Sequence, residues 1–240
     1  MGLGTYELLD YGDSAFLVEF SKVVTDEAWT KTHWLAKALS KIGLDGVTTI
    51  YPTYTTVMIV FNCLFVDREA LKQRIRDFVE TADYTPGANG NSGNCYRLPV
   101  VFGGAYGPDL PFVSECLGIT PEEVVRIFCD GFRKMLTFAT FGGFLMEGPP
   151  FGKNIPRCKS PHTEVPGGMV EVAGDKTAFI PVTTSTGWQV IGHCPVQIID
   201  LEQMPLVPYQ PGDYVEFFSI REDEQGEYEK KTICEMKVTT

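Results

Sequence analysis

Basic residues are in the minority in this sequence of 240 residues. It contains 20 Lys and Arg against 31 Asp and Glu, which gives a formal net charge of −11. Proteins that bind nucleic acid or anionic membranes concentrate Lys and Arg on the surface that meets the phosphates. We therefore expect neither nucleic acid nor a membrane surface as a partner, and we attribute the acidity to solubility.

Long apolar runs and paired cysteine motifs are also missing. No stretch approaches the ~20 apolar residues of a membrane span, and residues 1–10 have neither the basic start nor the apolar run of a signal peptide. The cysteines are odd in number and no two are spaced as CxxC, which argues against a disulfide scaffold or a zinc site. We expect a cytoplasmic protein with reduced thiols and no metal. The seven positions are Cys63, Cys95, Cys116, Cys129, Cys158, Cys194 and Cys234.

The common nucleotide and cofactor motifs are absent as well. The sequence has no P-loop, no dinucleotide-binding glycine fingerprint and no biotinylation motif. We expect that the chain neither activates ATP nor carries biotin by itself, and that it holds no cofactor. A small-molecule substrate remains the expected ligand.

The first region of the chain alternates strands and helices, and an apolar share of 44% supplies a normal globular core. Runs rich in β-branched and aromatic residues predict strands. Apolar residues at helical spacing, with Thr25 or Asp26 and then Asp67 as N-caps, predict two helices. In chain order the predicted elements are strand 15–20, helix 26–42, strands 47–51 and 56–61, and helix 67–81. This order favours a small α/β domain over residues 1–84.

The second region follows a linker of Pro, Gly, Asn and Ser, which we place at residues 85–95. A strand over 96–102 and two helices over 112–117 and from 120 onward come first, and short strands separated by Gly and Pro turns follow. These strands are expected at 169–172, 178–180, 188–192, 196–200 and 214–220. Their density favours a small barrel or sandwich over 96–222. Residues 223–240 are expected to form a charged, loose tail, in which 230–238 can add an edge strand.

Several ordered motifs resemble those of one known family. Gly12–Phe20 (GDSAFLVEF) is similar to its opening motif, and Leu98–Leu110 (LPVVFGGAYGPDL) is similar to its central signature, P-V-x-Y-G-G-x-Y-G-P-D-L. Further matches are Val165–Val170, Ala173–Thr177, Gly187–Gly192 and Pro211–Val215. Over residues 6 to 220 the chain thus resembles the allophanate hydrolase subunit 1 family, which includes KipI and the B subunits of 5-oxoprolinases.

The resemblance implies an α+β architecture, with a small N-terminal α/β domain and a C-terminal cyclophilin-like β-barrel. It also implies pairing with a homologous sister subunit into a carboxyltransferase-like module. In urea amidolyases such a module moves a carboxyl group from biotin to urea. In bacteria a similar pair works with a third subunit and ATP to open 5-oxoproline, and one relative inhibits a sensor kinase. Fold alone therefore leaves the function open.

The sequence departs from the family where the resemblance implies a cleft. The family's G-F-x-P-G-F-x-Y-L loop is altered here, and an acid, Glu147, lies close to it. Backbone N–H groups of Gly142 and Gly143 can approach a carboxylate or oxyanion, and we expect Phe144 beside them to contact substrate. The alternative is an ordinary turn. In the motif P-R-x-x-x-P-R, Arg157 is kept as a predicted anion anchor.

The second Arg of that motif is replaced by His162, which is either a general acid or base or a surface residue. In the A-G-G-Q-T motif, Asp175 and Lys176 replace Gly and Gln, so Lys176 is a candidate catalytic amine or fixed cation and Asp175 its tuning partner. A solvated ion pair at a turn is the alternative. Glu147 completes the predicted catalytic set.

Hydroxyl groups complete the predicted substrate-binding set. Thr184 and Thr186 can hydrogen-bond a polar ligand or serve as strand-edge residues. Tyr106 lies on the best-preserved loop, where we expect Asp109 to be structural, capping the next helix or ordering the turn. His193 and Cys194 are adjacent on a predicted strand and point to opposite faces, which argues against a thiol dyad.

Three functions follow from these patterns. The first is a subunit of a carboxyltransferase-like or 5-oxoprolinase-like enzyme that acts on a small amide or carboxylate. The second is a stand-alone lyase, isomerase or cyclase that uses the altered cleft. The third is a non-enzymatic binding protein like the kinase inhibitor. We favour the first as the family-level interpretation, with the second close behind.

Overall fold

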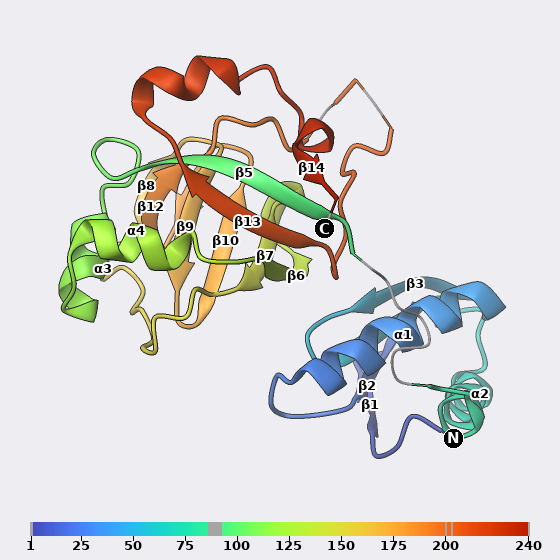
Figure 1. Cartoon of the computed structure of the whole chain (residues 1–240). Helices are drawn as coiled ribbons and strands as arrows, with labels where there is room; N and C mark the ends of the chain where they lie inside the picture. The colour runs from blue at the N-terminus through green and yellow to red at the C-terminus, as the bar shows by residue number, and fades with distance from the viewer. Residues whose placement is uncertain (1, 86–92, 200, 203, 240) are drawn as a thin grey trace. The chain divides into compact units, whose positions relative to one another are not determined.

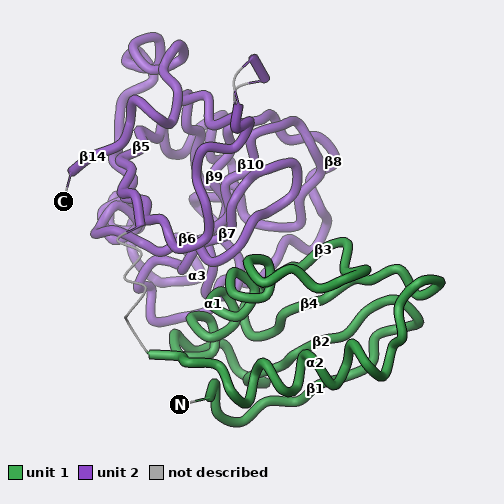
Figure 2. The backbone as a smooth tube through the Cα atoms, turned by 90° about the vertical axis from the view of Figure 1, so that its right-hand side faces the viewer, with its two compact units in different colours: residues 1–90 green, residues 91–240 purple. Residues whose placement is uncertain are grey.

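The computed structural model describes residues 2–85, 93–199, 201–202 and 204–239. The chain divides into two compact units, residues 1–90 and 91–240, which Figure 2 colours separately. The division falls in the segment expected as a linker, most of which lies outside the described residues. Within the described ranges, no helix is long and apolar enough to cross a membrane.

Unit 1 is a four-stranded antiparallel sheet with two helices. The sheet has the order β1-β2-β4-β3, and β1 was not predicted. Its elements are β1 (Glu7–Tyr11), β2 (Ala15–Glu19), α1 (Asp26–Ile42), β3 (Val47–Pro52), β4 (Thr56–Phe61) and α2 (Arg68–Thr81). Thr25 and Asp67 accept hydrogen bonds from backbone N–H groups in the first turns of α1 and α2, as expected of N-caps.

The core of unit 1 lies on one face of this sheet. In β4 the residues Val57, Ile59 and Phe61 are buried and alternate with half-buried ones. They pack with the apolar faces of both helices into one cluster, which includes Leu35 of α1 and Ile75 of α2. Strict period-two burial in the strand and helical spacing in the helices therefore produce a sheet covered by helices on one side.

Unit 2 is built on a closed β-barrel. Seven strands follow the order β12-β9-β10-β7-β6-β13-β5, and pairing of Gly192 and His193 in β12 with Phe102 and Val101 in β5 closes the ring. All pairs are antiparallel except β13 with β5. The strands, which Figure 1 labels, are β5 (Cys95–Phe102), β6 (Arg133–Phe138), β7 (Phe144–Glu147), β9 (Met169–Ala173), β10 (Lys176–Ile180), β12 (Gln189–His193) and β13 (Tyr214–Ser219). This is the barrel expected from the resemblance.

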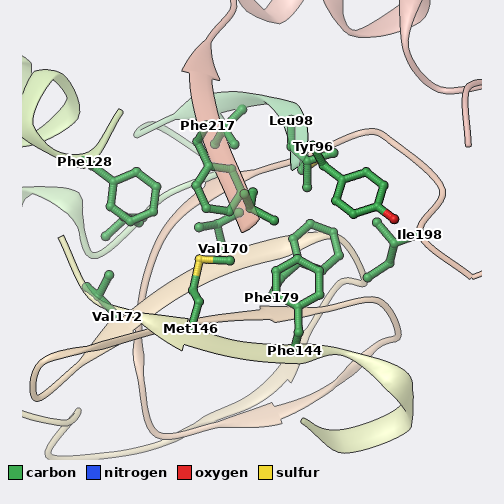
Figure 3. Close-up of a cluster of buried hydrophobic side chains, with 14 of the residues drawn as sticks. Tyr96, Leu98, Phe128, Phe144, Met146, Val170, Val172, Phe179, Ile198 and Phe217 are labelled. Atoms are coloured by element: carbon green, nitrogen blue, oxygen red, sulfur yellow. The ribbon is translucent and has the colours of Figure 1, made fainter. Parts of the chain in front are cut away.

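The barrel interior is a packed core. Figure 3 shows Phe144 and Met146 of β7 pointing toward Val170 of β9, Phe179 of β10 and Phe217 of β13. Phe144, a predicted substrate-binding residue, is only 1% exposed and stacks on Phe179 at a centroid distance of 5.3 Å. Its role is therefore packing within this core.

Two helices and a two-stranded ribbon complete unit 2. α3 (Leu110–Leu117) and α4 (Pro121–Phe128) follow β5, and α4 begins with a capping box between Thr120 and Glu123. The ribbon pairs β8 (His162–Val165), which was not predicted, with β11 (Thr184–Thr186), where strand-edge residues were one of two expectations. Residues 196–200 were expected as a strand, but their described part forms only an isolated bridge from Gln197 to Thr232.

The C-terminal residues pack on the barrel instead of forming a loose tail. A 3₁₀ helix, η2 (Glu222–Glu227), buries Gln225, and η3 (Ile233–Met236) buries Ile233 in the main core. β14 (Lys237–Val238) then pairs with Tyr96 and Cys95 at the edge of β5. Most residues of η2 are charged, but its buried residue, Gln225, is not. A segment of six residues is too short for sequence periodicity to show that it packs on the barrel.

Candidate functional site

Most of the predicted site residues lie at three places on unit 2. His162, Arg157 and Thr186 lie around the ribbon, with Asp109. Lys176 and Asp175 line a cavity at the turn between β9 and β10, and Gly142 lines a second cavity. We call the first place the ribbon site and define it by six residues: Asp109, Arg157, Cys158, His162, Glu171 and Thr186.

The ribbon lies against the outer face of the barrel. Along β9, Val170 and Val172 point into the main core, while Met169 packs outside it in a separate small cluster with Val190 of β12 and Val165 of the ribbon. Because side chains alternate along a strand, Glu171 shares the outer face with Met169. The ribbon therefore covers a carboxyl group that the barrel wall presents.

Glu171 supplies the buried carboxyl group of the ribbon site, and the residue is only 3% exposed. Its Oε2 accepts a hydrogen bond from the Thr186 hydroxyl, and Thr186 Oγ1 accepts one from the Trp188 N–H at 3.1 Å. Burial raises the pKa of the Glu171 carboxyl, although the Thr186 bond and the positive charges of His162 and Arg157 oppose the shift. A carboxyl group of this kind holds a proton more readily than an exposed one.

His162 lies opposite Thr186 in the ribbon and is bound to Asp109. Its Nε2 lies 2.8 Å from Asp109 Oδ2, and the Val190 N–H donates to the same oxygen at 2.8 Å. Asp109 precedes α3, but its side chain makes no capping bond there. The expectation that Asp109 caps this helix is therefore wrong, because its carboxylate is directed to the barrel wall and the ribbon.

Cys158 and Arg157 form the other edge of the ribbon site. The Cys158 thiol donates to the Trp188 carbonyl at 3.2 Å and to Gln189 Oε1 at 3.4 Å. Burial raises the pKa of this thiol, and the charge of Asp109 adds to the shift. The exposed Arg157 places its guanidinium 5.7 Å from the centroid of the Trp188 ring, a cation–π arrangement.

The cavity beside Lys176 has a volume of about 320 Å³ and is lined by residues 149–155 together with the β9–β10 turn. Lys176 Nζ lies 2.6 Å from Asp175 Oδ2, and the Asp175 side chain is 73% exposed. The hydrogen bond from Lys176 lowers the pKa of the Asp175 carboxyl. Glu147 pairs with Lys176 across β7 and β10 and accepts from the Lys134 N–H at 3.2 Å. None of the ribbon-site residues lines this cavity.

The cavity beside Gly142 is larger, about 660 Å³, and mostly apolar, with Phe141, Ile199 and Val207 in its wall. Gly142 has a φ of +79°, and its carbonyl accepts a hydrogen bond from the Tyr209 hydroxyl. The Gly143 N–H, expected as an oxyanion donor, already donates to the Thr140 carbonyl at 3.0 Å. This loop therefore has the contacts of a tight turn between β6 and β7.

The two remaining predicted residues lie apart from these cavities. The Tyr106 hydroxyl donates to Glu222 Oε1 at 3.3 Å, and its ring stacks on His193 at 5.7 Å. Tyr106 thus links the loop after β5 to η2. Thr184 occupies the ribbon, opposite Val165. Sequence reasoning did not single out Glu171 or Cys158 as site residues, and it gave Asp109 a structural role alone. The local signal for Glu171 is a lone acid in an apolar strand.

Comparison with known proteins agrees with the sequence motifs. The family model described as carboxyltransferase domain, subdomain C and D, matches residues 6–209. The 5-oxoprolinase B subunit of Bacillus subtilis (strain 168) is 27% identical over 241 residues, which covers 95% of this chain and 98% of that protein. The 5-oxoprolinase B subunit of Haemophilus influenzae is 30% identical over 162 residues, 66% of this chain and 73% of that protein.

Solved structures share the fold. A conserved uncharacterized protein from Pyrococcus horikoshii is 26% identical with a TM-score of 0.53, over 91% of this chain and 100% of that one. The Kluyveromyces lactis urea carboxylase gives a TM-score of 0.74 at 16% identity, over 92% of this chain and 22% of that one, which is a likeness of fold alone. On the match of residues 6–209, this chain belongs to the family of the carboxyltransferase domain, subdomain C and D.

Proposed function

We propose that this chain is the B-type subunit of a 5-oxoprolinase-type enzyme and that it binds a small amide-bearing carboxylate at the ribbon site. The Bacillus subtilis, Haemophilus influenzae and Escherichia coli O157:H7 relatives are each named as the B subunit of 5-oxoprolinase. A protein named as one subunit works with others, so we propose a homologous sister subunit as the partner. ATP activation is assigned to the partner side, since the sequence here has no P-loop.

The observation that carries the proposal is the placement of Glu171. A carboxyl group is buried on the outer wall of the barrel, with the positive charges of His162 and Arg157 near enough to act on its pKa. An exposed guanidinium suits the carboxylate of such a substrate because it donates two parallel hydrogen bonds. A carboxyl group with a raised pKa suits delivery of a proton to an amide nitrogen when the amide bond opens.

The first experiment tests the subunit assignment. The native mass of the tagged chain, purified from its own cells with co-purifying chains identified, is expected to show a stoichiometric complex with a sister subunit of the same family. The purified complex should hydrolyse ATP in response to 5-oxoproline. A lone monomer or homodimer would overturn the assignment and favour a stand-alone lyase, isomerase or cyclase.

The second experiment tests the role of Glu171 within that complex. Glu171→Gln keeps the size and the hydrogen-bonding capacity toward Thr186 but removes the proton, so kcat should fall by about 100-fold or more. Glu164→Gln is the matched control, because Glu164 is exposed on the same ribbon. Retention of the complex in both variants, measured by native mass, separates loss of chemistry from loss of assembly. Equal activity of the two variants would remove Glu171 from the reaction.

A further inference from the structure

Three side chains that bind metal ions in other proteins meet at the ribbon site. Asp109, Cys158 and His162 each offer one ligand atom, and these three atoms all lie within 4.8 Å of one another. Asp109 ends the loop after β5, Cys158 lies in the segment before the ribbon, and His162 begins β8. The fold therefore gathers a carboxylate, a thiol and an imidazole from three separate segments.

The distances are close to those that a tetrahedral ion requires. Zinc binds Cys at about 2.3 Å and His or Asp at about 2.0–2.2 Å, so its ligand atoms lie roughly 3.3–3.8 Å apart. Because no two of the three atoms are more than 4.8 Å apart, changes of at most about 1.5 Å in their separations give this spacing. The His162–Asp109 contact of 2.8 Å would lengthen slightly to admit the ion. A mixed Cys, His and Asp set suits the zinc class of ions, since thiolate is a poor ligand for magnesium or calcium.

The barrel wall holds one of the three ligands in place. The Val190 N–H donates to Asp109 Oδ2 at 2.8 Å. Metal ligands commonly depend on such outer hydrogen bonds for their orientation.

We propose that Asp109, Cys158 and His162 bind one divalent cation of the zinc class and leave a fourth coordination position open. His162 is 33% exposed and Asp109 is 17% exposed at the side chain, so an ion between them is reachable from solvent. Three protein ligands with an open position are typical of zinc that polarises a carbonyl or a water molecule. Arg157 and Glu171 belong to the same ribbon site, and Arg157 is close enough to Glu171 to affect its pKa.

A thiol nucleophile is the competing use of the same residues, and the hydrogen bonds argue against it. The Cys158 thiol donates to a backbone carbonyl and to Gln189, whereas an activated nucleophile bonds to its base. A bound ion removes the thiol proton outright and would replace both of these bonds.

The test uses the metal alone, so its failure is distinct from failure of the proposed function. The full chain, stripped with chelator and titrated with Co²⁺, should bind one equivalent and show visible d–d bands together with a near-ultraviolet thiolate-to-cobalt band. Zinc should displace the cobalt stoichiometrically. Elemental analysis of protein purified without chelator should find about one zinc per chain.

Matched variants decide which residues hold the ion. Cys158→Ser should abolish the thiolate-to-cobalt band, and His162→Ala should weaken binding by more than about 100-fold, beyond the effect of losing an outer-shell contact. Cys234→Ser removes an exposed thiol elsewhere and should bind like the parent chain. Circular dichroism checks folding, and Asp109→Asn gives a second conservative variant. The absence of a stoichiometric cobalt spectrum, or unchanged affinity in Cys158→Ser and His162→Ala, would overturn the proposal.

Discussion

The ribbon site and the cavity beside Lys176 both contain paired charged groups, yet they differ in what surrounds them. Glu171 and Asp109 are held by Thr186 and by the Val190 N–H, under or beside the ribbon. Asp175, the partner of Lys176, is a largely exposed side chain at a turn. Ion pairs at exposed turns contribute little energy and are weakly constrained. We therefore expect catalysis at the ribbon site, where the barrel wall holds the charged side chains in place and shields them from water.

The ribbon site and the cavity beside Lys176 should differ most in their effect on kcat. Lys176→Met removes the cation from the turn and should change kcat of the complex by less than about threefold, because its partner is an exposed carboxylate. Glu171→Gln should lower kcat by about 100-fold or more. ATP hydrolysis dependent on 5-oxoproline measures both. A complete loss of turnover in Lys176→Met, with the complex intact, would transfer the chemistry to the cavity beside Lys176.

The next largest effect is expected on stability, at the loop after β5 that carries Asp109. A Cβ at Gly107 would lie 2.0 Å from the Ile191 carbonyl oxygen and 2.6 Å from the Gly103 nitrogen, both rigid backbone. Gly107→Ala should therefore lower the free energy of unfolding by about 3 kcal/mol, the cost of overpacking a closed site. Denaturant unfolding measures this change.

Gly187→Ala is the control for that loop, since a Cβ there meets nothing within 4 Å. Gly187 follows the ribbon directly, and its substitution should change stability by no more than about 0.5 kcal/mol. Gly107→Ala should also weaken cobalt binding, because Asp109 lies two residues farther along the same loop. Equal stability of the two variants would show that the loop after β5 accommodates an added Cβ at little cost and does not hold Asp109 in place.

The sequence predicted most of unit 1 because its signals are local. Alternation in β4 and side-chain caps at Thr25 and Asp67 each depend on residues within a few positions of one another. The barrel strands β9, β10, β12 and β13 were also expected from their composition. The short strand β8 was missed and β11 was expected only as an alternative, since a ribbon of three or four mostly polar residues has no periodicity to detect.

The ribbon site was predicted only in part, for a different reason. Arg157 was found as a residue that the family motif keeps, His162 as a departure from that motif, and Thr186 through its hydroxyl group. Glu171 was missed because alternation assigns it to the outer face of a strand but does not reveal that a ribbon covers that face. The contact of Asp109 with His162 joins residues 53 positions apart. No local pattern predicts a contact of that separation, and it depends on closure of the barrel.

The dependence of stability on pH should show the smallest difference between the two places. The hydrogen bond from Lys176 lowers the pKa of Asp175 in the folded chain, so this pair stabilises the fold above the unfolded pKa near 3.8 and loses its effect as pH falls through the folded value. Because Asp175 is largely exposed, Asp175→Asn should cost less than about 1 kcal/mol at pH 7.

That difference should shrink as pH falls below 3.8, as the parent carboxyl group becomes protonated as well. Denaturant unfolding of both chains at a series of pH values, in the presence of chelator, measures it. Glu171 should behave in the opposite direction, since burial raises its pKa and its ionisation costs the folded state more as pH rises. A loss of several kcal/mol at pH 7 in Asp175→Asn would show that the Asp175–Lys176 pair is a constrained element of the fold. The contrast between a fixed ribbon site and a loosely held turn would then no longer stand.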